Sequence, residues 1–204
     1  LHSWVHYELE AASETPPDFD VVCFTSPSNV ELWTWPPPSK IVAIGKAPEG
    51  FQAQKTIDAK GCIVMPGLVD LSVRLKEPGH EHEGMLDSEL AAAVAGGVTS
   101  LVCPPDTDPV LDEPGLVEML RFKAEKLNRS KVMPLGALTR GLKGEILTEM
   151  VQLTEAGCVG FSQAEVALEN TQVLQRALQY ANSFGYTVWL RPQELHLGKG
   201  VAAS

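Results

Sequence analysis

From about Gly61 onward, short apolar runs alternate with amphipathic stretches, and this alternation constrains the fold more than any other feature. Glycine follows three of the amphipathic stretches, as is usual at a helix C-terminus. The expected strands cover residues 64–75, 98–103, 132–138, 158–161 and 187–190, and the expected helices cover 85–95, 112–127, 145–156 and 171–184. Such alternation predicts βαβ units and a parallel sheet.

Five strands with four intervening helices fit two architectures. One is an open, doubly wound sheet, and the other is the first part of an eight-fold barrel. No GxGxxG pattern follows a strand, so a nucleotide-binding open sheet has no support.

The first 60 residues differ in character and are interpreted as a separate arm or small β layer. Residues 21–25 and 41–44 are expected to be strands. Between them, residues 33–38 read WTWPPP, and proline lacks the N–H that a ladder requires, so we expect this stretch to stay out of a sheet. The sequence therefore divides into an arm over 1–60 and an α/β unit over 61–204.

Charge and composition exclude several classes of function. The net charge is −10 and the isoelectric point is about 4.9, so the chain repels phosphate backbones and anionic lipid. No apolar run approaches the roughly 20 residues needed to span a bilayer. The N-terminus lacks a signal-peptide pattern, and the four cysteines are too widely spaced to suggest a metal or redox pair. We expect a cytoplasmic protein that binds neither nucleic acid nor membrane.

Residues 64–79 read VMPGLVDLSVRLKEPG and resemble the first barrel strand and loop of dihydroorotases, members of the amidohydrolase superfamily. That family's pattern is PG-L-[IV]-D-x-H-x-H-L-R-E-P-G. Residues 92–99 (AAVAGGVT) and 103–110 (CPPDTDPV) resemble two further family motifs. The resemblance spans about residues 41–204. It implies an α/β fold, the N-terminal part of a (β/α)8 TIM-type barrel with about five strands, preceded by a small β segment and with the C-terminal half absent.

Dihydroorotases depend on zinc, which activates a water molecule for attack on a cyclic amide. Zinc takes imidazole and carboxylate ligands, and an HxH on a strand directs both imidazoles to one face. In this sequence the resemblance places Ser72 and Arg74 at those two histidine positions, and Arg191 at a histidine position of the fifth strand. Serine is a poor zinc ligand, and a guanidinium cannot coordinate. The resemblance therefore implies no zinc, no other cofactor and no catalytic residue.

Three further positions depart from the family pattern. Lys76 replaces the substrate-binding arginine and lacks its bidentate fork. Asp106 replaces an asparagine and would repel a substrate carboxylate. Gln163 lies where the family's F-S-D-D-G motif has an acid, and the acid of this segment is displaced to Glu165. With Ser72, Arg74 and Arg191, these are the degenerate active-site positions.

The forms GLVDLSV and CPPDT resemble the inactive dihydroorotase-like proteins of some bacteria. The resemblance implies a non-catalytic protein of pyrimidine biosynthesis that supports assembly of aspartate transcarbamoylase. The implied partner is the catalytic subunit of that enzyme, in a homo- or hetero-oligomer. The alternative is an active metal-dependent amidohydrolase, of dihydroorotase or hydantoinase type, that acts on a cyclic amide through other ligands.

Arg74 and Arg191 should both project into the space that the metal occupies in active relatives. Two guanidiniums in one cavity repel each other unless acids neutralise them, and the candidate acids are Asp70, Glu77 and Asp106. We favour an internal salt-bridge cluster, and the alternative is a pocket for an anionic ligand.

A second HxH, His80 and His82, follows the motif KEPG. These histidines fall in a loop, where we expect them to be solvated. The alternative is that they bind a metal ion.

Overall fold

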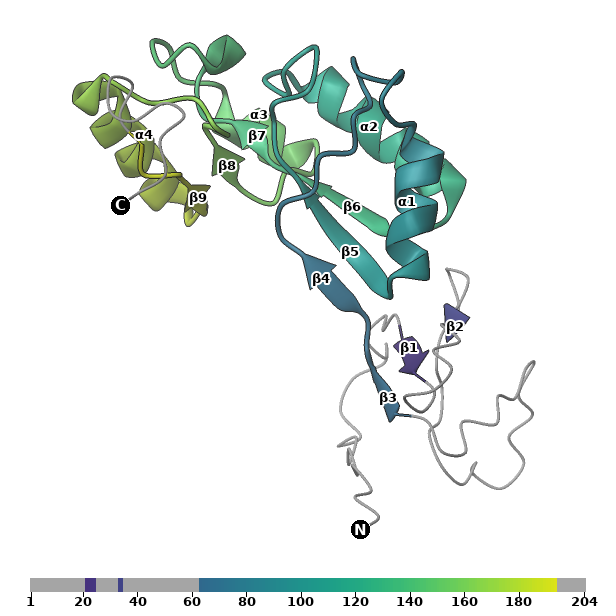
Figure 1. Cartoon of the computed structure of the whole chain (residues 1–204). Coiled ribbons are helices and arrows are strands. Elements are labelled where there is room, and N and C mark those ends of the chain that lie inside the picture. Colours follow the sequence, from purple (N-terminus) through teal and green to yellow (C-terminus); the bar gives the residue numbers. More distant parts are fainter. Residues whose placement is uncertain (1–20, 25–32, 35–62, 194–204) are drawn as a thin grey trace, which may run out of the picture.

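The computed structural model describes residues 21–24, 33–34 and 63–193. Six strand segments that pair in parallel follow one another in chain order (Figure 1). The first ladder joins β4 (Leu68–Asp70), β5 (Val98–Cys103) and β6 (Lys131–Pro134), and the second joins β7 (Gly136–Ala137), β8 (Phe161–Ser162) and β9 (Val188–Trp189). The expected α/β architecture with a parallel sheet is confirmed.

A single residue, Leu135, separates β6 from β7 within the expected strand 132–138. Its N–H donates to the carbonyl of Cys103 in β5 (2.9 Å), whereas the next amide, of Gly136, donates to Gly160 just before β8 (2.9 Å). The chain therefore passes directly from one three-stranded parallel sheet into the next. Among the described residues β4 and β9 do not pair with each other, so this part of the chain does not close into a barrel.

The expected strand 64–75 is divided between two sheets. β3 (Ile63–Pro66) pairs antiparallel with β1 (Val21–Phe24), while β4 pairs parallel with β5. Gly67 lies at the crossing, where a Cβ would come within 2.1 Å of Thr99 Oγ1. A side chain at this position would therefore collide with Thr99 of β5.

The prediction that residues 33–38 stay out of a β-sheet is wrong for Trp33 and Thr34. β2 (Trp33–Thr34) pairs antiparallel with β1, in the register Val22 to Thr34. Both residues precede the prolines and keep their backbone N–H groups, so the missing donors begin only at Pro36. The strand expected at 41–44 lies outside the described residues. The small sheet has the order β2-β1-β3. It therefore includes β3, which lies beyond the expected end of the arm at residue 60.

Three helices form where the pattern predicts them: α1 (Leu86–Ala95), α2 (Pro114–Leu127) and α4 (Thr171–Phe184). α2 begins with proline, which has no N–H to leave unpaired in the first turn. α4 begins after Asn170, whose side chain accepts N–H bonds from Gln172 (3.0 Å) and Val173 (3.3 Å).

The helix expected over 145–156 is shorter than predicted, because α3 comprises only Met150–Glu155. Before it, a 3-10 turn, η1 (Arg140–Leu142), leads into a segment that folds back so that Leu147 bridges to Thr139. The buried Thr148 hydroxyl donates to the carbonyl of Ala137, which holds this segment out of helical conformation. Ile146, which the expected helix would have included, lies in this segment and is 61% exposed.

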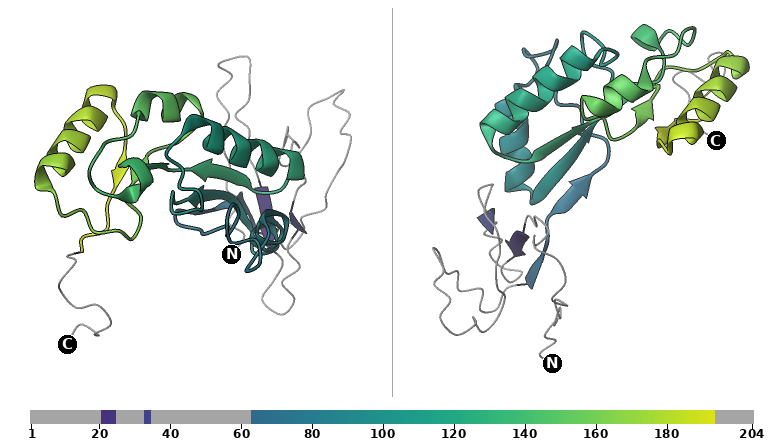
Figure 2. Two further views of the ribbon diagram at one scale, coloured as in Figure 1. Left: turned by 90° about the horizontal axis from the view of Figure 1, so that it is seen from above. Right: turned by 180° about the vertical axis from the view of Figure 1, so that it is seen from behind.

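The core lies between the sheet and its helices. α1 and α2 lie side by side against β5 and β6 (Figure 2), and α3 packs against β7. The largest fully buried apolar side chains are Leu75, Leu86, Leu90, Leu101, Leu111, Leu120, Leu135, Leu138, Met150, Leu153 and Phe161. Within the described residues, no helix has both the length and the apolar character to cross a membrane.

Candidate active site

The loops that follow β4, β5, β8 and β9 meet at the carboxyl ends of the strands, the edge at which parallel α/β proteins place their active sites. Two hollows of about 220 and 250 Å³ open there, and Arg74 and Pro104 line both. Lys76 and Asp106 line the first, and residues 72, 165 and 191 line the second. Five of the six degenerate positions thus gather around this edge.

Arg74 and Arg191 are joined through a chain of ion pairs. Arg74 Nε lies 2.9 Å from Asp106 Oδ2, and Arg74 Nη2 lies 3.3 Å from Glu165 Oε1. The same Glu165 oxygen lies 2.9 Å from Arg191 Nη1. Two cations and two anions therefore connect the ends of four strands. The arginines are paired with acids as the favoured interpretation expected, but the side chains are 25–61% exposed, so the cluster is not internal. The hydrogen bond with Asp106, followed by the attraction of Asp106 and Glu165, raises the pKa of Arg74 above its usual value.

Sequence reasoning named Asp106 among the acids that would neutralise the arginines, but it missed Glu165. The other two candidates take different partners. Asp70 Oδ1 accepts the backbone N–H of Ser72 (3.0 Å), and Glu77 pairs with Lys123 (3.0 Å). The displaced acid of the segment 161–165 was the available signal for Glu165, because it follows β8 at the same edge of the sheet.

Gln163 is the one degenerate position that the structure does not bring to either hollow. Its side chain is 2% exposed, accepts a hydrogen bond from Thr139 Oγ1 (3.0 Å), and donates one to the carbonyl of Leu142 (2.7 Å). It therefore holds η1 against β8 from inside the core.

Lys76 is engaged by a neighbouring acid, because its Nζ lies 2.6 Å from Glu83 Oε2. Cys103 also lines the first hollow, but burial raises the pKa of its thiol to about 12. Cys158 is a second free, buried thiol, and burial raises its pKa to about 12 as well. Since the thiolate is the reactive form, neither cysteine is a nucleophile at neutral pH.

The residues at this edge do not fit the zinc on which active dihydroorotases depend. Zinc requires three or four nitrogen, sulfur or oxygen donors around one point. The positions assigned to its imidazoles hold a serine and two guanidiniums, and each guanidinium bonds a carboxylate that would otherwise be available as a ligand. A dication between Arg74 and Arg191 would also meet two positive charges.

Comparisons with known proteins point to one family. Residues 61–188 match the family model described as "Dihydro-orotase-like". The chain is 50% identical over 161 residues to the dihydroorotase-like protein of Pseudomonas aeruginosa, covering 79% of this chain and 38% of that protein. It is 43% identical over 157 residues to the dihydroorotase of Geobacter metallireducens, covering 76% of this chain and 36% of that protein.

Among solved structures, the L-hydantoinase (dihydropyrimidinase) from Arthrobacter aurescens matches with a TM-score of 0.59 at 24% identity. The match covers 84% of this chain and 40% of that one, and at this identity it establishes the fold alone. The chain spans less than two fifths of the length of the curated relatives named above. Motifs, parallel sheet and family match agree, and the chain belongs to the dihydroorotase-like family of the amidohydrolase superfamily.

Proposed function

We propose that this chain is part of a non-catalytic, cytoplasmic dihydroorotase-like protein of pyrimidine biosynthesis, and that the protein supports assembly of aspartate transcarbamoylase. The observation that carries the proposal is the ion-pair chain from Asp106 through Arg74 and Glu165 to Arg191. It occupies the edge of the sheet where an active relative needs metal ligands.

The chemistry of the reaction explains why this arrangement argues against catalysis. An amide resists attack by water unless a metal ion polarises its carbonyl and lowers the pKa of the attacking water. Guanidinium groups cannot hold that metal. Two carboxylates at the edge, Asp106 and Glu165, each bond a guanidinium, and only Asp106 Oδ1, which is buried, is left without a hydrogen-bond partner among the buried side-chain atoms described.

Substrate recognition is also disfavoured. Dihydroorotate is an anion, and Lys76, at the position of the substrate-binding arginine, already bonds Glu83 at 2.6 Å. Asp106 lies beside it on the wall of the same hollow and would repel a carboxylate. An incoming substrate would therefore have to displace an acid and accept a second one as its neighbour.

A non-catalytic assembly protein needs an exposed apolar surface that a partner can bury. Met119 and Phe122, one helical turn apart on α2, are 37% and 67% exposed, and Leu178 and Phe184 of α4 are exposed as well. Stable obligate interfaces bury on the order of 2,000 Å² around an apolar centre. The outer faces of α2 and α4 are where we place the contact with the catalytic subunit of aspartate transcarbamoylase.

Co-expression of the full-length protein with that catalytic subunit, followed by size-exclusion chromatography, tests the proposal. We expect one co-eluting complex that persists in moderate salt, because apolar contacts are not screened. Phe122→Ser on α2 should weaken it, whereas the matched control Ile146→Ser, on the exposed segment before α3, should not.

Arg74→Ala should also leave the complex intact, since Arg74 lies at the strand ends and not on an outer helix. Separate elution of the two proteins at micromolar concentration would remove the partner from the proposal. Metal-dependent hydrolysis of dihydroorotate would instead favour the active amidohydrolase.

A further inference from the structure

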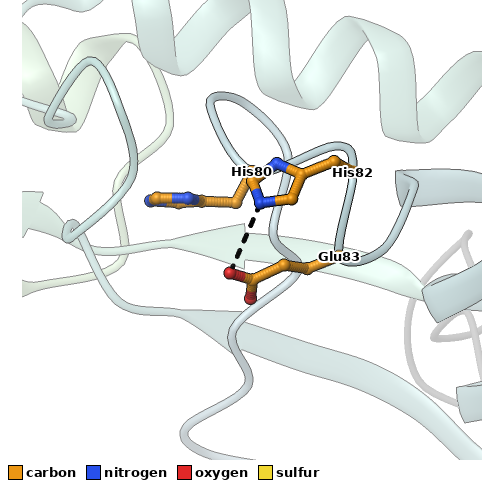
Figure 3. Close-up of side chains that lie close together, drawn as sticks. All are labelled: His80, His82 and Glu83. Atoms are coloured by element: carbon orange, nitrogen blue, oxygen red, sulfur yellow. Dashed lines mark ion pairs between the residues drawn. The ribbon is translucent and has the colours of Figure 1, made fainter.

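The loop that leads from β4 towards α1 gathers two histidines and a glutamate on one side (Figure 3). One ligand atom from each of His80, His82 and Glu83 lies within 4.8 Å of the other two. His82 Nε2 is 3.7 Å from Glu83 Oε1, and the two imidazole centroids are 6.1 Å apart. The sequence alone did not bring Glu83 into this group.

Backbone hydrogen bonds give the loop a defined shape. The N–H of His80 donates to the carbonyl of Lys76 (2.7 Å), and the N–H of Glu83 donates to the carbonyl of His80 (2.9 Å). Gly79 has a φ of +105°, and a Cβ there would lie 2.4 Å from the carbonyl oxygen of Asp108. The loop is therefore packed closely against a neighbouring backbone, and its turn brings Glu83 back towards the histidines.

The carboxylate of Glu83 is already oriented by a second residue. Lys76 Nζ bonds Oε2 at 2.6 Å and leaves Oε1 directed at His82. This hydrogen bond and the charge of Lys76 lower the pKa of Glu83, so the carboxylate is ionised at neutral pH. Metal-binding carboxylates commonly have one oxygen fixed in this way by an outer partner.

We propose that His80, His82 and Glu83 form a binding site for a divalent transition metal, best matched by Zn²⁺, at the rim of the hollow beside Arg74 and Asp106. Two imidazoles and one carboxylate are a ligand set that zinc accepts, with the fourth position left to water. Ligand atoms of a tetrahedral zinc with bonds of about 2 Å lie about 3.3 Å apart, so the side chains must close by about 1.5 Å. All three residues are exposed, so the movement falls to the two imidazoles, which would turn towards the Glu83 oxygen that Lys76 leaves open.

The local charge also suits a dication. Glu77, Glu81 and Glu83 bring three negative charges to the loop, against the positive charges of Lys76 and Lys123. The site shares no ligand with the edge positions Ser72, Arg74 and Arg191, although His80 and Glu83 line the same hollow as Arg74, and the proposal does not rest on the proposed function. Because the ligands are exposed and one position is open, the metal should exchange readily with chelators.

Calorimetric titration of the metal-free, tag-free full-length protein with Zn²⁺ tests the proposal. We expect one equivalent to bind at this loop, with affinity lowered at least about tenfold by His82→Asn and by Glu83→Gln. The matched control is Glu81→Gln, which makes the same change of charge in the same loop. Its carboxylate accepts the N–H of Gly79 at 3.1 Å and is not one of the three ligands, so affinity should stay within about twofold.

One measurement on the unaltered protein completes the test. Zn²⁺ should shift the ring-proton NMR signals of His80 and His82. The proposal is overturned if no equivalent binds, if binding survives both ligand substitutions, if Glu81→Gln weakens it equally, or if these two histidines do not respond.

Discussion

Gln163→Leu tests the role of the one degenerate position that lies inside the core and away from both hollows. The Gln163 amide accepts a hydrogen bond from Thr139 Oγ1 and donates one to the carbonyl of Leu142. Leucine has similar volume but satisfies neither group. Each unsatisfied buried polar group costs about 1–3 kcal/mol, and the added apolar burial offsets about 1 kcal/mol. We therefore expect the free energy of unfolding to fall by about 1–5 kcal/mol.

Urea denaturation of the full-length protein, followed by circular dichroism, measures this change. The matched control is Gln175→Leu on the exposed face of α4, which should change the free energy of unfolding by no more than about 0.5 kcal/mol. If Gln163→Leu were as mild as this control, the side chain would be a vestige of an active site rather than a core hydrogen-bonding group.

Three further predictions concern the strand ends. The double substitution Ser72→His with Arg74→His should not produce measurable hydrolysis of dihydroorotate, because Arg191 still occupies a ligand position; turnover at rates typical of enzymes would contradict this. Glu165→Gln should lower the free energy of unfolding by only about 1 kcal/mol, because 57% of its side chain is exposed and exposed ion pairs contribute little; a loss above about 3 kcal/mol in urea denaturation would contradict this. Cys103 should resist a thiol reagent at pH 8 until the protein unfolds, since burial raises its pKa to about 12; rapid labelling of the folded protein, mapped by mass spectrometry, would refute its burial.

The elements that were predicted correctly are those whose signals are local. β5 needs only a β-branched apolar run, and α4 has a capping asparagine before it and Gly185 after it. Such signals act within a few residues, so they are visible in one sequence. The sequence also predicted that Arg74, Asp106 and Arg191 lie close together, because the carboxyl ends of parallel strands meet at one edge of the sheet.

The elements that were missed depend on contacts between distant segments. No local sequence signal divides residues 64–75 between two sheets. The division results from the pairing of β3 with β1 and of β4 with β5. The late start of α3 depends on the bond from Thr148 to Ala137, eleven residues away. The inward turn of Gln163 and the pairing of Glu165 with both arginines likewise depend on the tertiary fold.

The central claim is that the strand ends of this dihydroorotase-like protein do not catalyse, and turnover of dihydroorotate by the full-length protein tests it most directly. The assay is run with added Zn²⁺, alone and in the presence of the aspartate transcarbamoylase catalytic subunit, so that a missing metal or partner cannot explain a negative result. The ion pairs of Arg74 and Arg191 predict no turnover above the uncatalysed rate under any of these conditions. Turnover that requires metal and is lost on chelation would contradict the claim.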